Sequence, residues 1–203
     1  MHFSKQLVTH ETCVVSQHAL FKQQLVTHEI CVPPSSLGVD ALICAVGFVP
    51  GNPLKMGSEA HKVDNVGTCA LFDAAKAAGV KKIVLVSSIL SDAGSWDQRG
   101  SVGFKITNAF GGVLDEKIVA ERYLRSLGLD YTIVRPGGLK ATPPSGKLVV
   151  SGENTLNSGE VSRDLVASVC IQALFTPSST NRVVELYENE EEGTTQLPAD
   201  KWF

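Results

Sequence analysis

The stretch VDNVGTCALFDAAKAAGVKKIVLVSS, residues 63–88, decides the fold, because it predicts a helix, a tight turn and a strand in direct succession. The apolar face of this helix consists of Leu71, Ala74, Ala75 and Ala78. Asp64 or Asn65 can cap its first turn, and Gly79 supplies the left-handed residue that ends many helices. Residues 81–88, KKIVLVSS, then form a strand whose continuous apolar run is typical of burial on both faces of a sheet.

The same alternation of strand and helix continues on both sides of this stretch. Strands are predicted at 40–47 (DALICAVG), 130–136 (DYTIVRP) and 181–187 (NRVVELY), and helices at 111–128 and 162–174. Strands that alternate with helices pair in parallel, and the helices cross over between them. The sequence therefore predicts an α/β fold with a mostly parallel sheet and helical crossovers.

The two later helices each have an apolar face. In the helix at 111–128 this face consists of Leu114, Ile118, Tyr123, Leu124 and Leu127. In the helix at 162–174 it consists of Leu165, Val166, Val169, Cys170 and Ala173. Ser162 is placed to cap the second of these helices. Glu121 and Arg125, four residues apart, are predicted to form an ion pair along the first.

Composition restricts the classes of function. A chain of 203 residues with 43% hydrophobic and 19% charged residues is long enough for one domain with a sizeable core. The formal net charge of -3 leaves no basic stripe for nucleic acid, which favours a small molecule or a protein as the partner. No apolar run approaches the roughly 20 residues that a membrane span needs, so no transmembrane segment is expected.

The cysteines and the two ends of the chain bear on its compartment. Cys44, Cys69 and Cys170 lie in apolar segments, where a free thiol behaves as a small hydrophobe, and this indicates a reducing compartment. The first fifteen residues contain Glu11, lack arginine and have no apolar stretch with a cleavage site, so no targeting signal is expected. The acidic segment 188–203 is expected to be a loosely held, solvated tail.

Small or polar residues follow three consecutive predicted strands. Ala45 and Gly47 end the first, Ser87 and Ser88 end the second, and the turn PGGL at 136–139 ends the third. In an open parallel sheet, ligands bind outside the carboxyl ends of the strands. Glycine and serine end strands in many proteins, but three such ends in succession favour a binding groove.

These residues resemble the atypical short-chain dehydrogenase/reductases, in particular the NAD(P)H-binding branch of plastid and cyanobacterial proteins related to the redox subunit of the chloroplast import translocon. The similarity covers residues 38–187 and includes VDNVGTCALFDAAKAAGVKKIVLVSS, KIVAERYLRSLGLDYTIVRPGGL and GEVSRDLVASVCIQAL, with YTIVRPGGL as its most specific phrase. It implies a Rossmann-like fold that binds NADP or NAD, with NADP slightly preferred, and a chloroplast location. The residues that the resemblance places along the cofactor groove are Ala45, Gly47, Asp64, Ser87, Lys117, Pro136, Gly137, Gly138 and Leu139.

The resemblance also suggests that Ser87 or Ser88 forms a hydrogen bond with a substrate carbonyl and that Lys117 contacts the ribose, and Ser88 and Lys117 are taken as the candidate catalytic residues. Active members of the group use a Tyr-x-x-x-Lys pair, in which the lysine lowers the pKa of the tyrosine that transfers the proton. Lys117 matches the lysine, but Val113 occupies the tyrosine position and cannot donate a proton. An ordinary solvated helix lysine is the alternative interpretation of Lys117.

The second departure from the family lies before Gly38, the first glycine of the chain, because the family begins with a strand and a glycine-rich turn that holds the pyrophosphate. Here the phrases KQLVTHETCV (5–14) and QQLVTHEICV (23–32) repeat instead. We therefore expect an atypical leader at 1–37 and a Rossmann-like domain at 38–187 that lacks the first βαβ unit. Without that unit the first predicted strand would be an exposed edge, which one or both LVTHE segments of the repeat could cover.

The repeat allows one alternative interpretation as a metal site. His10 with Cys13 and His28 with Cys31 form two H-x-x-C pairs, a spacing that superficially resembles zinc ligands. Structural zinc pairs usually lie on turns with glycine or proline, whereas QLVTHETCVV has β-branched residues and no turn residue. The pattern favours a short strand or an extended arm, and no metal ligand is predicted.

The sequence leaves alternative functions open. The first is an NAD(P)(H)-binding protein, a reductase or a redox sensor, whose affinity for the nicotinamide dinucleotide is impaired by the missing glycine-rich turn. The second is a non-catalytic scaffold or assembly factor that keeps the fold and binds a protein partner, and the third is a fragment whose complete relative binds the cofactor. The three strand ends favour the first function, and the missing tyrosine and glycine turn favour the other two.

Overall fold

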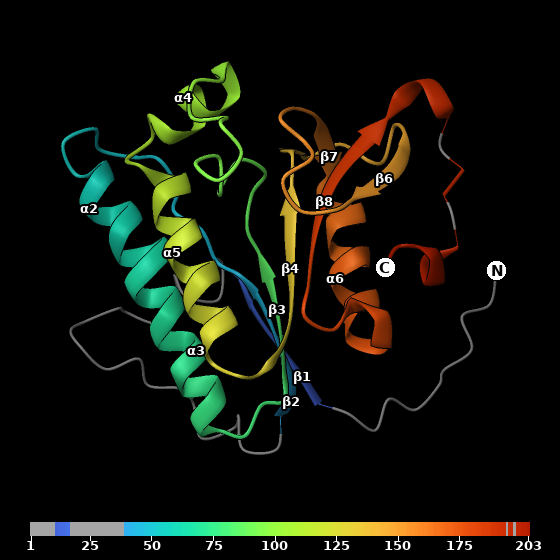
Figure 1. The fold of residues 1–203 in the computed structure, drawn as a ribbon, viewed down its shortest axis with the longest axis horizontal. Helices are drawn as coiled ribbons and strands as arrows, with labels where there is room; N and C mark the ends of the chain where they lie inside the picture. The colour runs from blue at the N-terminus through green and yellow to red at the C-terminus, as the bar shows by residue number, and fades with distance from the viewer. Residues whose placement is uncertain (1–10, 17–38, 194, 197) are drawn as a thin grey trace.

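The computed structural model describes residues 11–16, 39–193, 195–196 and 198–203, which form an α/β domain built on one six-stranded sheet (Figure 1). Its strands, in spatial order, are β1 (Glu11–Ser16), β2 (Val39–Ala45), β3 (Lys82–Val86), β4 (Asp130–Pro136), β8 (Arg182–Asn189) and β6 (Lys147–Ser151). The first five are parallel, and β6 pairs with β8 in the antiparallel direction. The predicted fold class is therefore confirmed.

Helices cover both faces of this sheet (Figure 1). One face carries α2 (Met56–Ala60), η2 (His61–Gly67), α3 (Thr68–Ala77) and α5 (Val113–Ser126), and the other carries α6 (Arg163–Phe175). A short helix, α4 (Val102–Asn108), lies beyond the carboxyl ends of the strands. The remaining elements are short: β5 (Gly138–Lys140), β7 (Glu160–Ser162), η3 (Pro177–Ser179), η4 (Glu190–Glu192) and η5 (Ala199–Lys201).

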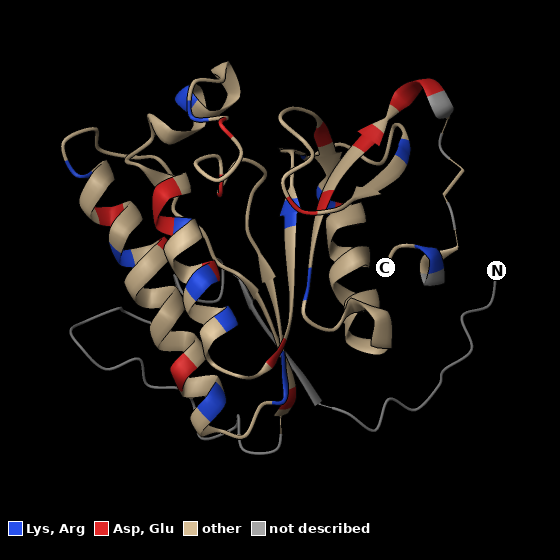
Figure 2. Cartoon of the chain, in the orientation of Figure 1, with Lys and Arg blue, Asp and Glu red and all other residues tan. Residues whose placement is uncertain are grey.

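Charged residues of both signs are spread over the visible elements (Figure 2). This distribution agrees with the near-neutral composition and shows no one-sided basic face in that view. Along the part of the chain that the structure describes, no helix combines the length and the apolar character that crossing a bilayer requires.

The four predicted strands correspond to β2, β3, β4 and β8, and their ends shift by no more than two residues. The sequence analysis did not predict β5, β6, β7 or α4. These elements have three to seven residues, which is too short for a hydrophobic period to be visible.

The apolar face predicted for α6 is confirmed in full. Its buried residues are Leu165, Val166, Val169, Cys170 and Ala173. They pack against the side chains of Ile43, Val84, Val134, Val184 and Leu186 from four parallel strands. Ser162 is the N-cap, because its hydroxyl oxygen accepts a hydrogen bond from the Leu165 amide at 3.2 Å.

The helix before β3 begins earlier than the sequence predicted. It starts at Met56 and runs without interruption through η2 into α3, so neither Asp64 nor Asn65 is a cap. Asp64 lies inside the helix and is 2% exposed. The face of α3 also differs, because Phe72 is fully buried and Leu71 is only half-buried. The predicted stop is confirmed, since Gly79 has φ +82°.

The edge of the sheet next to β2 is covered by β1, which contains the last four residues of the first repeat copy, 11–14, and the two residues that follow it. The two strands are parallel, with Thr12 opposite Ala41 and Ser16 opposite Ala45. Of the LVTHE segment of the first copy, only Glu11 belongs to this strand and residues 7–10 lie outside the described residues, so coverage of the edge by an LVTHE segment stays a prediction. The second copy, together with His10, His28 and Cys31, lies outside the described residues.

The acidic tail was expected to be loosely held, but its end packs on the domain. Trp202 is 8% exposed and belongs to the apolar cluster under α6, with Ala199 and Phe203 beside it. The reason is hydrophobic: an indole and a phenyl ring bury enough apolar surface to hold a short segment against a helix.

Candidate functional site

The carboxyl ends of β2, β3 and β4 meet at one edge of the sheet, as the sequence predicted. The segment after β3 runs beside the end of β4, because the Ser87 amide donates to the Val134 carbonyl at 2.7 Å and the Ile89 amide donates to the Pro136 carbonyl at 3.0 Å. Open parallel sheets bind their ligands at this edge, outside the carboxyl ends of the strands.

Asp64 and Lys117 form an ion pair at this edge, with 2.7 Å between Lys117 Nζ and Asp64 Oδ1. The Asp64 side chain is fully buried, and that of Lys117 is 16% exposed. The second carboxylate oxygen, Oδ2, accepts a hydrogen bond from the Phe48 amide at 3.1 Å. The carboxylate thus ties the loop after β2 to α5 and holds the ammonium group of Lys117 at the carboxyl end of the sheet.

Gly47 lies against this pair. A Cβ atom at position 47 would stand 3.5 Å from Lys117 Nζ and 3.7 Å from Asp64 Oδ1, which is ordinary van der Waals contact. A longer side chain would have to displace the ammonium group or cover it. The small residue therefore keeps Lys117 approachable from the loop after β2.

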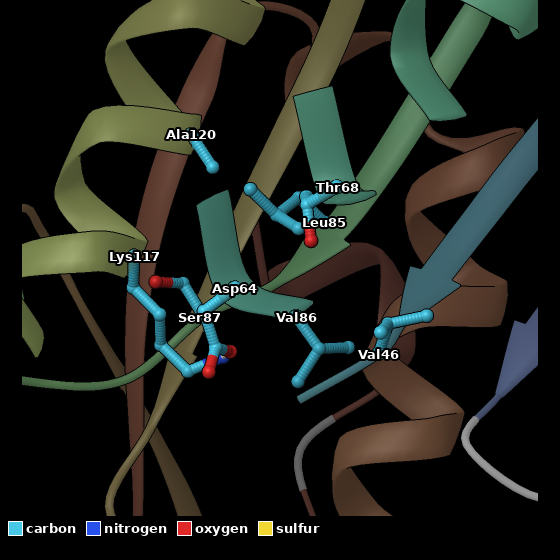
Figure 3. Close-up of a pocket in the computed structure, with 8 residues that line it drawn as sticks. All are labelled: Val46, Asp64, Thr68, Leu85, Val86, Ser87, Lys117 and Ala120. Carbon is cyan, nitrogen blue, oxygen red and sulfur yellow. Dashed lines mark ion pairs between the residues drawn. The ribbon is translucent and has the colours of Figure 1, made fainter. Parts of the chain in front are cut away.

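A small pocket with an empty volume of about 180 Å³, part of it open to solvent, lies around these groups (Figure 3). Its lining residues are Val46, Asp64, Thr68, Leu85, Val86, Ser87, Lys117 and Ala120. In Figure 3 the side chains of Asp64 and Lys117 point toward one another, from η2 and from α5. Four of the lining residues are apolar, and the other four supply one charged pair and two hydroxyl groups.

The local backbone explains how these groups reach the pocket. Asp64 lies in η2, a π-helical segment, where the Thr68 hydroxyl bonds the Val63 carbonyl at 2.8 Å. Such segments add a residue to the turn and are frequent at functional sites. Asn108 is the last residue of α4, and its side-chain oxygen accepts hydrogen bonds from the amides of Leu114 and Asp115. These bonds fix the first turn of α5, which leads to Lys117.

The predicted site residues fall into two groups. Gly47, Asp64, Ser87 and Lys117 lie together around the pocket. Ala45 is exposed at the end of β2, and Ser88 is half-buried, with no hydrogen bond from its hydroxyl to any residue that the structure describes. Pro136 ends β4, Gly138 and Leu139 begin β5, and Gly137 alone connects the two strands, so the predicted turn at 136–139 is shorter than expected.

The turn after β4 requires glycine at position 137. A Cβ atom there would lie 2.4 Å from the carbonyl oxygen of Gly159, which no packing adjustment of a side chain can relieve. The close approach allows the Gly138 amide to donate to that same carbonyl at 2.9 Å and pairs β5 with β7. The phrase PGGL thus has a structural role beside the groove.

The sequence analysis missed a set of buried charges behind the pocket, and its predicted Glu121–Arg125 pair is wrong. Glu121 is fully buried and bonds Arg135, with 2.6 Å between Arg135 Nη2 and Glu121 Oε2 and 3.1 Å between Arg135 Nε and Glu121 Oε1. Arg125 instead pairs with Glu153. The available signal was an arginine inside the apolar strand DYTIVRP, which implies a buried partner.

Glu121 also accepts hydrogen bonds from two serines. Ser87 Oγ lies 2.5 Å and Ser91 Oγ 2.7 Å from the same carboxylate oxygen, Oε1. The hydrogen of the Ser87 hydroxyl is therefore committed to Glu121, and towards the pocket Ser87 can only accept. This leaves Ser88 as the hydroxyl of the segment that can donate.

Glu185 of β8 completes the buried network. Arg135 Nη1 lies 3.3 Å from Glu185 Oε1, and both side chains are fully buried. Glu185 accepts from the backbone amides of Asn154, Thr155 and Leu156 at 2.7–3.0 Å. Burial by itself would lower the pKa of Arg135, but the hydrogen bonds and negative charges of its carboxylate partners raise it overall.

None of the residues that line the pocket is a tyrosine. Val113 is the first residue of α5 and packs at the edge of a small apolar cluster that contains Ile89 and Leu114. Tyr123 lies further along α5 and donates its hydroxyl hydrogen to Asp73 at 2.6 Å, a bond that raises its pKa. Neither residue offers an acid to the pocket.

Among the described residues, no group of three or more histidine, cysteine, aspartate or glutamate side chains could hold a metal ion. Cys44, Cys69 and Cys170 are free thiols. Burial raises the pKa of Cys44 to about 11 and that of Cys170 to about 12, so both stay protonated at neutral pH. They fill the core, as the sequence analysis expected.

A family model described as NAD(P)H-binding matches residues 31–177. This match covers the residues that line the pocket, the buried Glu121 and Arg135, and the strands β2, β3 and β4, whereas β8 with Glu185 follows it. The chain therefore belongs to this family of NAD(P)H-binding proteins.

Relatives agree with the resemblance found in the sequence. An uncharacterized chloroplastic protein of Arabidopsis thaliana is 46% identical over 74% of this chain and 53% of its own length. Protein TIC 62 of Pisum sativum, also chloroplastic, is 34% identical over 82% of this chain and 31% of its own length. The chain thus spans about half the length of the first relative and a third of the second.

A solved structure gives the same fold. ChuY of Escherichia coli O157:H7, described as an anaerobillin reductase, has a TM-score of 0.57 and 27% sequence identity. The alignment covers 74% of this chain and 64% of ChuY. The Rossmann-like arrangement expected from the sequence is confirmed by this similarity.

Proposed function

We propose that this chain binds NADPH, and more weakly NADH, across the carboxyl ends of β2, β3 and β4, and that it acts as an NAD(P)H-dependent reductase. The observation that carries the proposal is the Lys117–Asp64 pair, which holds an ammonium group beside Gly47 at the family's cofactor-binding edge. A lysine fixed by a buried carboxylate has a defined position, unlike a solvated surface lysine.

The residues fit the ribose and nicotinamide end of such a cofactor. Lys117 Nζ carries three hydrogens, so it can donate to ribose hydroxyl oxygens while it stays in ionic contact with Asp64. Ala45 and Gly47 leave the strand end open to close approach, and the turn at Pro136–Leu139 bounds the groove on the β4 side.

A bound nicotinamide cofactor would supply the hydride, and the chain would orient the substrate that receives it. Ser88 is the proposed donor to a substrate carbonyl, because its hydroxyl is uncommitted within the described residues whereas that of Ser87 is held by Glu121. The substrate stays unassigned. The reductase described for ChuY supports this class of reaction over a redox sensor, and the chloroplastic relatives support a plastid location.

The test is a titration of the purified chain with NADPH and NADH, followed by nicotinamide fluorescence and by the thermal midpoint. A ligand that binds only the folded state stabilises it by about 2.7 kcal/mol at a hundredfold excess over Kd, so binding raises the midpoint. We expect micromolar affinity for NADPH.

Lys117→Met should weaken NADPH binding by about tenfold, which corresponds to about 1.4 kcal/mol, the size of one charged hydrogen bond. Lys62→Met is the matched control, because Lys62 is an exposed lysine on η2 with no ion pair to a described residue. Equal affinity in both variants would reject the assigned role of Lys117. A wild-type chain without a response to millimolar cofactor would reject the reductase and favour the scaffold.

A further inference from the structure

The segment 87–91, directly after β3, is held at both ends by one carboxylate oxygen. Ser87 Oγ and Ser91 Oγ both donate to Glu121 Oε1, at 2.5 and 2.7 Å. Ser87 lines the pocket, and Ser88 lies between the two contacts. The conformation of the segment therefore depends on a side chain of α5 as well as on its own backbone.

The segment also carries backbone strain. Leu90 has φ +65°, in the left-handed region that leucine rarely adopts, and its side chain is buried at 3% exposure. Such a residue persists only where its surroundings determine its conformation. The contact from Ser91 to Glu121, one residue further, and the packing of Leu90 with Phe104 and Leu114 supply those surroundings.

Glu121 is itself held in place by charge. Arg135 bonds both carboxylate oxygens of Glu121, and Glu185 and Asn154 bind the other end of the guanidinium group. Glu121 stands four residues after Lys117, so both side chains lie on the same face of α5. The helix thus presents the proposed cofactor contact and the support of the groove wall one turn apart.

We propose that Glu121 is a positioning residue, which acts through Ser87 and Ser91 to hold segment 87–91 as the wall of the nicotinamide groove. Arg135 keeps its carboxylate in place. The inference rests on the proposed function, because it assigns the groove to a nicotinamide cofactor. It adds a role for a buried network that the reaction itself does not use.

The experiment uses Ser91→Ala in the full chain, because this change removes one arm of the contact and leaves Glu121 paired with Arg135 and Ser87. Ser179→Ala is the matched control: Ser179 is also a buried serine, its hydroxyl hydrogen is shared between the carbonyls of Ala173 and Thr176 while its oxygen accepts from Lys82, and it lies in η3, after α6. Both variants lose buried hydroxyl hydrogen bonds. Only Ser91→Ala alters the groove wall.

Two readouts are measured on the wild type and on both variants: amide hydrogen exchange of a peptide that covers 87–93, and the Kd for NADPH by fluorescence. In Ser91→Ala we expect exchange of this peptide to rise about tenfold, as loss of a hydrogen bond to a charged group predicts. The Kd for NADPH should rise about threefold, because a less ordered wall costs more to fix on binding. Ser179→Ala should change neither.

The outcomes separate the inference from the proposed function. Unchanged exchange in Ser91→Ala overturns the inference even if the wild type binds NADPH. Faster exchange with an unchanged Kd also overturns it, since the contact would then be structural only. A wild type that binds neither nicotinamide cofactor overturns the proposed function, and the inference falls with it.

Discussion

The two faces of the sheet are built in different ways. The α6 face rests on an apolar cluster, in which Val169 and Leu186 are fully buried. The α5 face is also apolar along most of its length, but toward the carboxyl ends of the strands it buries Asp64, Glu121 and Arg135. The helices of the two faces also differ in how many charged residues they carry: α3 and α5 have charges of both signs, whereas α6 is uncharged over most of its length (Figure 2).

This difference indicates that the α5 face is less stabilising than a fully apolar face would be. Apolar burial stabilises the fold without regard to direction, whereas a buried ion pair must offset the loss of hydration of both ions. Nonpolar residues of similar size would often be as stable or more so. Asp64, Glu121 and Arg135 are buried at the edge where the pocket lies, which is the expected pattern if they orient groups there.

The largest effect should come from removing the cation of the network. Arg135→Met would leave Glu121 and Glu185 buried without a counter-ion, at a cost of about 4 kcal/mol in the free energy of unfolding. Urea denaturation measures this loss. In the double variant Arg135→Met with Glu121→Gln, part of the stability should return, because one uncompensated charge is gone. No recovery in the double variant would contradict the electrostatic explanation.

A smaller effect is expected from the apolar face. Val169→Ala removes two buried methyl groups from α6 and should cost about 2 kcal/mol, which combines the transfer free energy with a small cavity. Its Kd for NADPH should equal that of the wild type, because α6 lies on the opposite face of the sheet from the pocket. A changed Kd would show that the two faces are coupled, and the comparison between them would fail.

The smallest effect concerns Lys140 and Glu188, whose charged groups lie 2.6 Å apart near the start of α6. Burial would raise the pKa of Glu188, but hydrogen bonds from Lys140 and the Ser162 amide lower it overall, from an ordinary 4.5. The hydrogen bond to Glu188 raises the pKa of Lys140 above its ordinary 10.5, against the opposing effect of burial.

The signs predict a plateau in the contribution of this pair. The lowered pKa of Glu188 stabilises the folded state above pH 4.5, and this stabilisation is lost as the pH falls through the pKa of the folded state. The raised pKa of Lys140 stabilises the folded state below pH 10.5, and this stabilisation is lost as the pH rises through the pKa of the folded state. Lys140→Met should therefore have a lower thermal midpoint than the wild type at pH 7, and the difference should shrink at strongly acid pH. A difference that is constant across the acid range would contradict this assignment.

Much of the fold could be predicted from local patterns. The strands at β2, β3, β4 and β8 have apolar runs that are visible without a structure, and the helix stops at Gly79 and Gly128 both have positive φ. The prediction was wrong at the start of the helix before β3. A polar residue such as Asp64 has the same local signature as a cap and as the buried end of an ion pair.

The site could be predicted only in part. Gly47, Ser87 and the turn at 136–139 were visible because strand ends of parallel sheets gather at one edge. Glu121 was assigned to the wrong partner. A spacing of four residues along the helix favours Arg125, and it gives no information about Arg135, which lies on strand β4. The roles of Ser88 and Lys117 in catalysis stay predictions.

The sequence by itself determined the order of strands and helices, the parallel sheet and the edge where a ligand can bind, because hydrophobic period and turn residues act over a few neighbours. Only the tertiary structure decided that Asp64 meets Lys117 and that Glu121 meets Ser87, Ser91 and Arg135. The physical reason is that a buried charge must find its partner across the packed interior, and such a partner can lie on any element that the fold brings near.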